Sequence, residues 1–252
     1  MIPVIPEVEG FEFFVDDWPF FEPNGDLIHI ARVNQDEIAI AMCDIFWSMC
    51  GTPPELLEKV ASEVRHAIVT PLDPARILER LDAVIRPILN PPDSLRCAFV
   101  TMSLVVLNVR DGSMTMACGG HPWMVIRRTD GSLEFPDKEI NGRSLGINHG
   151  DDEIKAEYFF ETGKAKLDPG DVAIIYSDGV IEASDIHGNW FGGLSDDMRT
   201  FGYVIARTDG GPKAIGEAVM NRLFEFIGGV TRSDDVALIC FGPKPDFRPA
   251  AT

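Results

Sequence analysis

The sequence is poor in basic residues and in cysteine, and it has no apolar run long enough to cross a membrane. Lys and Arg number 22 against 40 Asp and Glu, which gives a net charge of −18. Bulk electrostatics then disfavour phosphate backbones and anionic lipid surfaces, so we expect no nucleic acid and no membrane as partners. The stretch Met1–Asp17 lacks the basic and apolar regions of a signal peptide. We therefore expect a cytoplasmic protein.

The 5 cysteines are scattered, odd in number and without a CxxC pair. Several of them lie in apolar stretches that are typical of buried strands. This pattern favours reduced, buried thiols over a disulfide framework or a zinc site.

Short apolar stretches separated by turn signals predict a protein rich in antiparallel strands. Helical spacing of apolar residues predicts one pair of helices within residues 52–90 and a second pair within residues 194–226. The middle of the chain, from Cys97 to Arg128, reads as a β-meander, and Glu153–Phe160 as a further strand. Strands segregated from two helix pairs indicate an α+β sandwich of two sheets with helices outside.

The first strong motif is a hairpin near the N-terminus. Leu27–Val33 and Ile38–Met42 are strand-like and flank the polar turn Asn34–Glu37. Asp26 opens this hairpin and Asp44 follows its second strand. Because the turn lies midway between them, the two acids are expected at the same end, facing each other across the ladder.

The second strong motif is Asp171–Glu182, where an apolar, β-branched run ends abruptly in Ser-Asp-Gly. It predicts a buried central strand, with Asp178 at its exit and Gly179 allowing a sharp turn. A carboxylate at this place is either an N-cap for the next segment or a functional group that is paired or bound to a metal.

Asp234 repeats this setting at the edge of the last predicted strand. Asp26, Asp44, Asp178 and Asp234 thus all flank apolar strands at strand-to-loop junctions. Hard divalent cations such as Mg²⁺ and Mn²⁺ prefer oxygen ligands of this kind. The pattern indicates a metal site, although spacing alone does not show that the four side chains converge.

The ordered set of motifs resembles the SpoIIE/RsbU branch of the type-2C metal-dependent serine/threonine phosphatases (the PPM family). The resemblance runs from about Asn24 to Phe241. The segments that carry it are Asn24-Gly25-Asp26, Cys43-Asp44-Ile45, Asp73-Pro74 through Leu81, Phe99-Val100-Thr101, Gly119-Gly120-His121-Pro122, Ser144-Leu145-Gly146-Ile147, Pro169 through Glu182, and Asp234-Asp235-Val236-Ala237-Leu238.

That resemblance implies an αββα sandwich with two Mn²⁺ or Mg²⁺ ions between the sheets. Asp44 would bridge the ions, Asp178 and Asp234 would hold one, Asp26 would help with the other, and the backbone at Ile45 would supply a carbonyl. A metal-activated water, and no side chain, would attack a phosphoserine or phosphothreonine. The substrate expected from the resemblance is a phosphorylated STAS-domain anti-anti-sigma protein in a partner-switching pathway that regulates a bacterial sigma factor.

The expected organisation is an N-terminal strand or extension over residues 1–23, a phosphatase domain over 24–242 and a flexible tail over 243–252, with no sensor domain. Gly179 and Asp235 flank the expected metal ligands and are candidate cleft residues. His121 lies at a strand break, where a structural role near the cleft is favoured over a catalytic one.

Two departures from the family pattern leave other functions open. The family's small, glycine-rich loop is replaced by Phe46-Trp47-Ser48-Met49-Cys50-Gly51, which would alter or cover the cleft. A family carboxylate is replaced by His29, which is either a partner of metal-bound water or an ordinary strand histidine. The alternatives are a pseudophosphatase that binds a partner through Phe46 and Trp47, and a two-metal hydrolase of a small phosphate ester.

Overall fold

A computed structural model of the protein describes residues 4–20, 24–47, 53–91, 98–147, 160–192 and 199–249. None of the helices in these ranges is long and apolar enough to span a bilayer.

In the described ranges, two antiparallel sheets of five strands each form the centre of the molecule. Sheet A and sheet B are named here by their strands. Sheet A has the order β1 (Phe11–Trp18), β10 (Val236–Pro243), β9 (Val172–Tyr176), β6 (Val125–Arg127) and β7 (Leu133–Glu134). Sheet B has the order β2 (Asp26–Arg32), β3 (Glu37–Trp47), β4 (Ala98–Asn108), β5 (Ser113–Gly119) and β8 (Gly163–Lys166).

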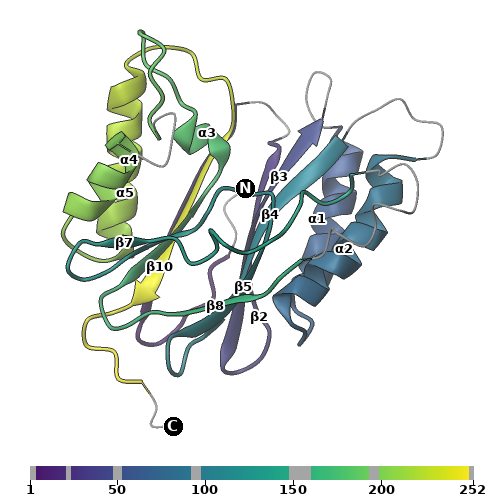
Figure 1. Ribbon diagram of the computed structural model, residues 1–252, viewed down its shortest axis with the longest axis horizontal. Coiled ribbons are helices and arrows are strands. Elements are labelled where there is room, and N and C mark those ends of the chain that lie inside the picture. The colour runs from purple at the N-terminus through teal and green to yellow at the C-terminus, as the bar shows by residue number, and fades with distance from the viewer. Residues whose placement is uncertain are drawn as a thin grey trace.

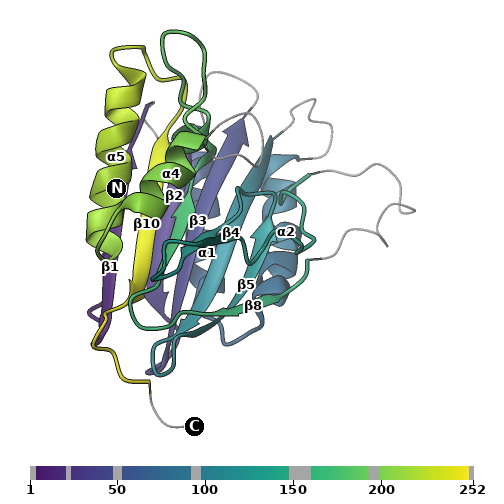
Figure 2. The ribbon, with the colours of Figure 1, turned by 60° about the vertical axis from the view of Figure 1, so that its left-hand side comes forward.

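Helices cover the outer face of each sheet, so the predicted α+β sandwich is confirmed. In Figure 1 the layers run from α4 and α5 on the left, through the two sheets, to α1 and α2 on the right, and Figure 2 shows the same order from another side. The helices are α1 (Pro54–Ile68), α2 (Pro74–Leu89), the single turn α3 (Asp178–Ile181), α4 (Arg199–Arg207) and α5 (Pro212–Ile227).

The alternation of side chains along β3 explains two of the three apolar layers. Ile38, Ile40 and Met42 point between the sheets, whereas Ala39 and Ala41 point toward α1 and α2. Because both faces of β3 are covered, all five side chains are fully buried. A third apolar layer lies between sheet A and α4 and α5. The layers account for the near-continuous apolar runs in the sequence.

Cys43, Cys118 and Cys240 are buried free thiols, as predicted. Burial raises the pKa of the Cys118 thiol to about 12, so it stays protonated and unreactive at neutral pH. Cys50 and Cys97 lie outside the described residues.

The predicted central meander is wrong. β4 and β5 pair within sheet B, but the chain then crosses to sheet A, where β6 pairs with β9 and β7. The crossing is made at Gly119–Met124, beside the end of β5 at which the site lies. The strand predicted at Glu153–Phe160 lies outside the described residues except for Phe160, which is not in a strand.

A buried carboxylate, Asp82, ties α2 to the loop at residues 141–147. Asp82 accepts hydrogen bonds from Gly146 N (2.7 Å) and Arg143 Nη2 (3.0 Å), and it also pairs with Arg86 one turn along the helix. Leu145 in turn makes an isolated bridge with Val100 on β4. The helix, the loop and the strand are therefore held as one unit.

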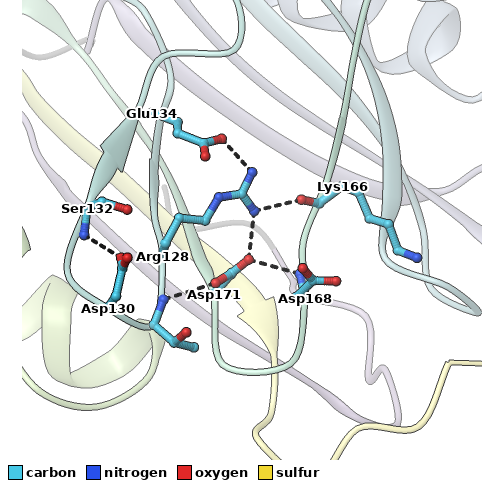
Figure 3. A network of polar contacts seen from close by, with 8 residues as sticks. Arg128, Asp130, Ser132, Glu134, Lys166, Asp168 and Asp171 are labelled. Carbon is cyan, nitrogen blue, oxygen red and sulfur yellow. Dashed lines mark hydrogen bonds and ion pairs between the residues drawn. The ribbon is translucent and has the colours of Figure 1, made fainter.

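A second buried carboxylate, Asp171, closes the end of β9 that is far from Asp178. It accepts hydrogen bonds from Thr129 N (3.1 Å), Asp168 N (2.9 Å) and Arg128 Nη1 (2.7 Å), as Figure 3 shows. Arg128 also pairs with Glu134 of β7. The Pro-Gly-Asp motif of the sequence thus fastens two turns of sheet A together.

Candidate metal centre

Asp26 and Asp44 are direct partners in the β2–β3 ladder, as the hairpin pattern predicted. Asp26 shares its strand face with Ile28, and Asp44 shares its face with Met42; both of these apolar residues point between the sheets. The two carboxylates therefore lie at the end of the inter-sheet layer, adjacent across the ladder.

Asp178 and Asp234 approach from sheet A. β9 ends at Tyr176, and Asp178 is the first residue of α3, whose N-cap position is occupied by Ser177. The N-cap interpretation of Asp178 is therefore wrong by one residue. Asp234 lies two residues before β10, which is the neighbour of β9 in the sheet. Figure 1 shows α3 at the same end of the layers as the tip of β3.

Gly179 allows the two sheet A segments to touch. A Cβ built on Gly179 would lie 1.8 Å from the Asp235 carbonyl oxygen and 3.3 Å from Asp234 Cβ. No side chain fits there. Gly179 therefore sets the spacing between Asp178 and Asp234 and packs on backbone.

Three oxygen atoms surround Gly25, the residue before Asp26. A Cβ at Gly25 would lie 3.4 Å from the Ile45 carbonyl oxygen, 3.4 Å from Asp235 Oδ2 and 3.6 Å from Asp44 Oδ1. The Ile45 carbonyl oxygen, which is expected to be a metal ligand, thus lies near the Asp44 carboxylate and near the residue that precedes Asp26.

The carboxylates repel one another. Burial, then the neighbouring Asp44, raises the pKa of Asp26 well above its usual value, and a hydrogen bond from Ser177 opposes this. Burial, followed by Asp178, Asp234 and Asp235, raises the pKa of Asp44 to about 7. The pKa values of Asp178 and Asp234 are also raised, chiefly by burial. These mutual effects place the four side chains in one electrostatic neighbourhood.

The donor set fits a hard divalent cation. It consists of oxygen atoms only, and the described charges that act most strongly on Asp26 and Asp44 are those of other carboxylates. Asp26 Oδ2 is buried and has no hydrogen-bond partner among the described residues. Within those same residues, however, no group of three or more His, Cys, Asp or Glu side chains is arranged so that it could already hold an ion. The carboxylates are neighbours and do not form a closed ligand set.

One contributor to the site, Ser177, was not predicted, and the contacts of a second, Asp235, were not predicted either. Ser177 carries the hydroxyl that bonds to Asp26, and its Oγ also accepts a hydrogen bond from Ala237 N (2.9 Å). Asp235 was predicted as a cleft residue, but it is buried and accepts hydrogen bonds from the backbone of Phe20 and Gly25. The serine directly before Asp178 was the available signal for the first; no local pattern signals the second.

His29 does not join the carboxylates. It lies between Leu27 and Ala31 on the helix-facing side of β2, the face opposite to Asp26. Burial and then Arg65 of α1 lower the pKa of His29 to about 4. The ordinary strand histidine is therefore the interpretation that this placement favours.

Phe46 and Trp47 belong to β3 and not to a loop, so this part of the prediction is corrected; Ser48–Gly51 lie outside the described residues. Trp47 packs against the helix-side apolar layer. Phe46 shares the strand face of Asp44, is 46% exposed, and stacks on Phe99 with ring centroids 4.7 Å apart. The bulky pair extends the strand beyond Asp44.

His121 is buried where the chain crosses between the sheets. Its Nδ1 lies 2.9 Å from Thr101 Oγ1, and Thr101 is the ladder partner of Asp44. Burial lowers the pKa of His121 to about 3, so the imidazole is neutral. Its contacts are those of a residue that fixes the wall beside Asp44.

Known proteins share both the sequence pattern and the fold. The sequence model of the SpoIIE family (Stage II sporulation protein E) matches residues 56–243. Phosphoserine phosphatase RsbU of Bacillus subtilis (strain 168) is 25% identical over 186 residues, which are 73% of this chain and 50% of that protein. The chain thus spans about half the length of this curated relative.

Solved structures agree. The RsbU and RsbW domains of Rv1364c from Mycobacterium tuberculosis superpose with a TM-score of 0.72 at 16% identity, over 97% of this chain and 63% of that chain. RsbX in complex with magnesium gives a TM-score of 0.61 at 16% identity, over 96% and 99%. At such identities the superpositions establish the fold. Together with the family match over most of the chain, they show that this protein belongs to the SpoIIE family and has the type-2C phosphatase fold.

Proposed function

We propose that this chain is a Mn²⁺- or Mg²⁺-dependent protein phosphatase that hydrolyses phosphoserine or phosphothreonine. The observation that carries the proposal is the pairing of Asp26 with Asp44 at the end of the inter-sheet layer, with Asp178 and Asp234 in the same electrostatic neighbourhood. Among the described residues, the buried Asp26 Oδ2 has no hydrogen-bond partner and the neighbouring charges are acidic, an arrangement that is costly unless a metal ion neutralises it.

Asp44 and Asp26 would hold the ions from sheet B with the Ile45 carbonyl, and Asp178 and Asp234 would hold them from sheet A. When bound, two such ions supply an acidified water for attack on phosphorus and neutralise charge on the phosphoryl group.

Side chains beside the proposed ligands hold them in position. The Ser177 hydroxyl fixes one side of the Asp26 carboxylate. His121 is neutral and contacts Thr101, the ladder partner of Asp44, so it supports the strand beside the site. Asp44, Asp178 and Asp234 ligate in the deprotonated form, and because the pKa of Asp44 is raised to about 7 without a metal, cation binding at this site should be coupled to the loss of a proton.

The proposed substrate is a phosphorylated STAS-type anti-anti-sigma partner. The support is the relationship to RsbU, a phosphoserine phosphatase, and the presence of an RsbW domain beside the RsbU domain in Rv1364c. The motifs that relate the chain to this family include the segments that contain Asp26, Asp44, Asp178 and Asp234.

One observation favours a second candidate, a partner-binding module without catalysis. The half-exposed Phe46 ring, stacked on Phe99 next to Asp44, offers the kind of aromatic surface that anchors protein interfaces. Both functions need the same fold and differ in whether phosphate ester bonds are broken.

The test is hydrolysis of a phosphoserine peptide, a phosphorylated STAS protein and a small aryl phosphate with saturating Mn²⁺. The proposal expects release of phosphate from the phosphoprotein and its loss in the Asp178→Asn variant. Release from the aryl phosphate alone would instead indicate a small-ester hydrolase. No release from any substrate would contradict the proposal and favour the binding module.

A further inference from the structure

The Asp235 carboxylate binds the backbone of the segment that joins the two sheets. Asp235 Oδ1 accepts a hydrogen bond from Phe20 N (2.5 Å), and Oδ2 accepts one from Gly25 N (2.7 Å). Phe20 follows β1 of sheet A, and Gly25 precedes β2 of sheet B. Asp235 is only 7% exposed, so these bonds form where water does not compete freely.

Arg232, in the same loop before β10, contacts the same connection. Its Nη1 donates to the Trp18 carbonyl oxygen (2.7 Å) and its Nη2 to the Pro19 carbonyl oxygen (3.0 Å). The loop at residues 232–235 therefore holds the β1–β2 connection at both ends. Arg232 and Asp235 bind the end next to β1, and Asp235 also binds the end next to β2.

Gly25 is fixed from both sheets. Its N–H binds Asp235, and its carbonyl oxygen accepts a hydrogen bond from Ile45 N (3.1 Å). The next residue is Asp26, whose N–H is bound by Asn24 Oδ1 (2.8 Å). The backbone that carries the Asp26 carboxylate is thus placed directly against Asp44 and Ile45 by the Asp235 contact.

We propose that Asp235 is a positioning residue for the metal centre: it holds Gly25 and Asp26 against Asp44 and so sets the affinity for the divalent cation without ligating the ion. Its two oxygens accept hydrogen bonds from backbone N–H groups, whereas Asp26 Oδ2 has no hydrogen-bond partner within the described part of the chain. This inference rests on the proposed function, since it assumes a cation at Asp26 and Asp44.

The experiment measures Mn²⁺ binding to the full chain by calorimetry for the wild type and the Asp235→Asn variant. Asn keeps one acceptor oxygen but presents an amide N–H₂ to the second backbone N–H, so one hydrogen bond is lost. Removing such outer partners weakens metal binding by about 10–100-fold, and we expect the dissociation constant to rise at least about tenfold.

Asp171→Asn is the matched control. Asp171 is also a buried aspartate that accepts backbone hydrogen bonds, from Thr129 and Asp168 (Figure 3), but it lies at the end of β9 opposite to Asp178. It should lower the melting temperature as Asp235→Asn does, yet leave the Mn²⁺ dissociation constant within about twofold of the wild type. If Asp235→Asn fails to fold, Asp235→Glu, which displaces the carboxylate by one methylene, takes its place with the same expected direction.

An unchanged dissociation constant in the Asp235 variant, with the wild type binding Mn²⁺, would overturn the positioning role alone. A Mn²⁺-bound crystal structure with an Asp235 oxygen in the ion's coordination sphere would also overturn it, because Asp235 would then be a ligand. Mn²⁺ binding by the wild type without hydrolysis of any phosphoprotein would refute the proposed function and leave the positioning role standing.

Discussion

Asp26 on β2 and Asp44 on β3 are directly paired across the ladder, two carboxylates facing each other at the residue where β2 begins. Like charges in such a pair destabilise a sheet, and here neighbouring acids from the other sheet add to the repulsion. The hairpin is therefore under electrostatic strain in the absence of a cation.

Asp44→Asn should stabilise the metal-free protein at pH 8. The pKa of the Asp44 carboxyl is raised to about 7 in the folded state, against about 4 in the unfolded state. The protonated carboxyl therefore contributes to the free energy of unfolding in full below pH 4, and this contribution is lost as the pH rises through 7. Neutralising the side chain should recover roughly 1–3 kcal/mol at pH 8 and flatten the loss of stability between pH 4 and 7. Urea unfolding in EDTA at several pH values measures both, and a variant less stable than the wild type at pH 8 would refute the expected repulsion.

Asp178→Asn should abolish Mn²⁺-dependent hydrolysis while changing the melting temperature little. The N-cap position of α3 belongs to Ser177, so the substitution removes a ligand charge without removing the cap residue. We expect phosphate release to fall by at least about 100-fold, since a divalent site loses one of its anionic ligands. Glu182→Gln, which changes a carboxylate at the other end of the same turn, is the control and should stay within a few-fold of wild type.

Gly179→Ala should destabilise the fold through a backbone collision. The added Cβ would meet the Asp235 carbonyl oxygen at 1.8 Å, and neither backbone can move without displacing β10 or α3. The expected loss is about 3 kcal/mol or more. Gly188→Ala is the comparison: its φ is +77° and nothing lies within 4 Å, so only conformational strain of about 1–2 kcal/mol applies. Equal losses in the two variants would argue against the tight packing at Gly179.

Asp82→Ala should cost about 2–4 kcal/mol of unfolding free energy. The substitution leaves Arg143 and Arg86 beside an empty position and removes the acceptor of Gly146 N. Glu58→Ala, which breaks an exposed pair with Arg65, should change stability by about 0.5 kcal/mol or less. Chemical denaturation of both variants measures the difference. A loss at Asp82 no larger than at Glu58 would contradict the buried network.

The sequence contained enough to predict the site-bearing hairpin and the Asp178 strand. A polar turn between two apolar stretches determines register locally, so Asp26 and Asp44 could be paired from spacing alone. The run before Ser177 has the composition of a strand buried on both faces, and all five residues of β9 are buried.

The parts that could not be predicted depend on contacts between distant segments. The crossing from β5 to β6 follows from sheet packing and not from the turn at Gly119–Gly120, which also suits a simple hairpin. Whether His29 points toward the helices or between the sheets depends on which layer packs on each face of β2, and the sequence of β2 alone does not determine that. The contacts of Asp235 with Phe20 and Gly25 span more than 200 residues, as 215 and 210 positions separate the partners.

The proposed binding of divalent cations by Asp26, Asp44, Asp178 and Asp234 can be observed in a crystal of the protein that has been soaked in Mn²⁺. Anomalous scattering locates each Mn²⁺ ion independently of the side chains. We expect anomalous peaks bounded by these four carboxylates and the Ile45 carbonyl oxygen, with Asp235 still bound to Gly25. A map without a peak at this end of the sandwich at saturating Mn²⁺, or with ions held only elsewhere, would contradict the proposed binding.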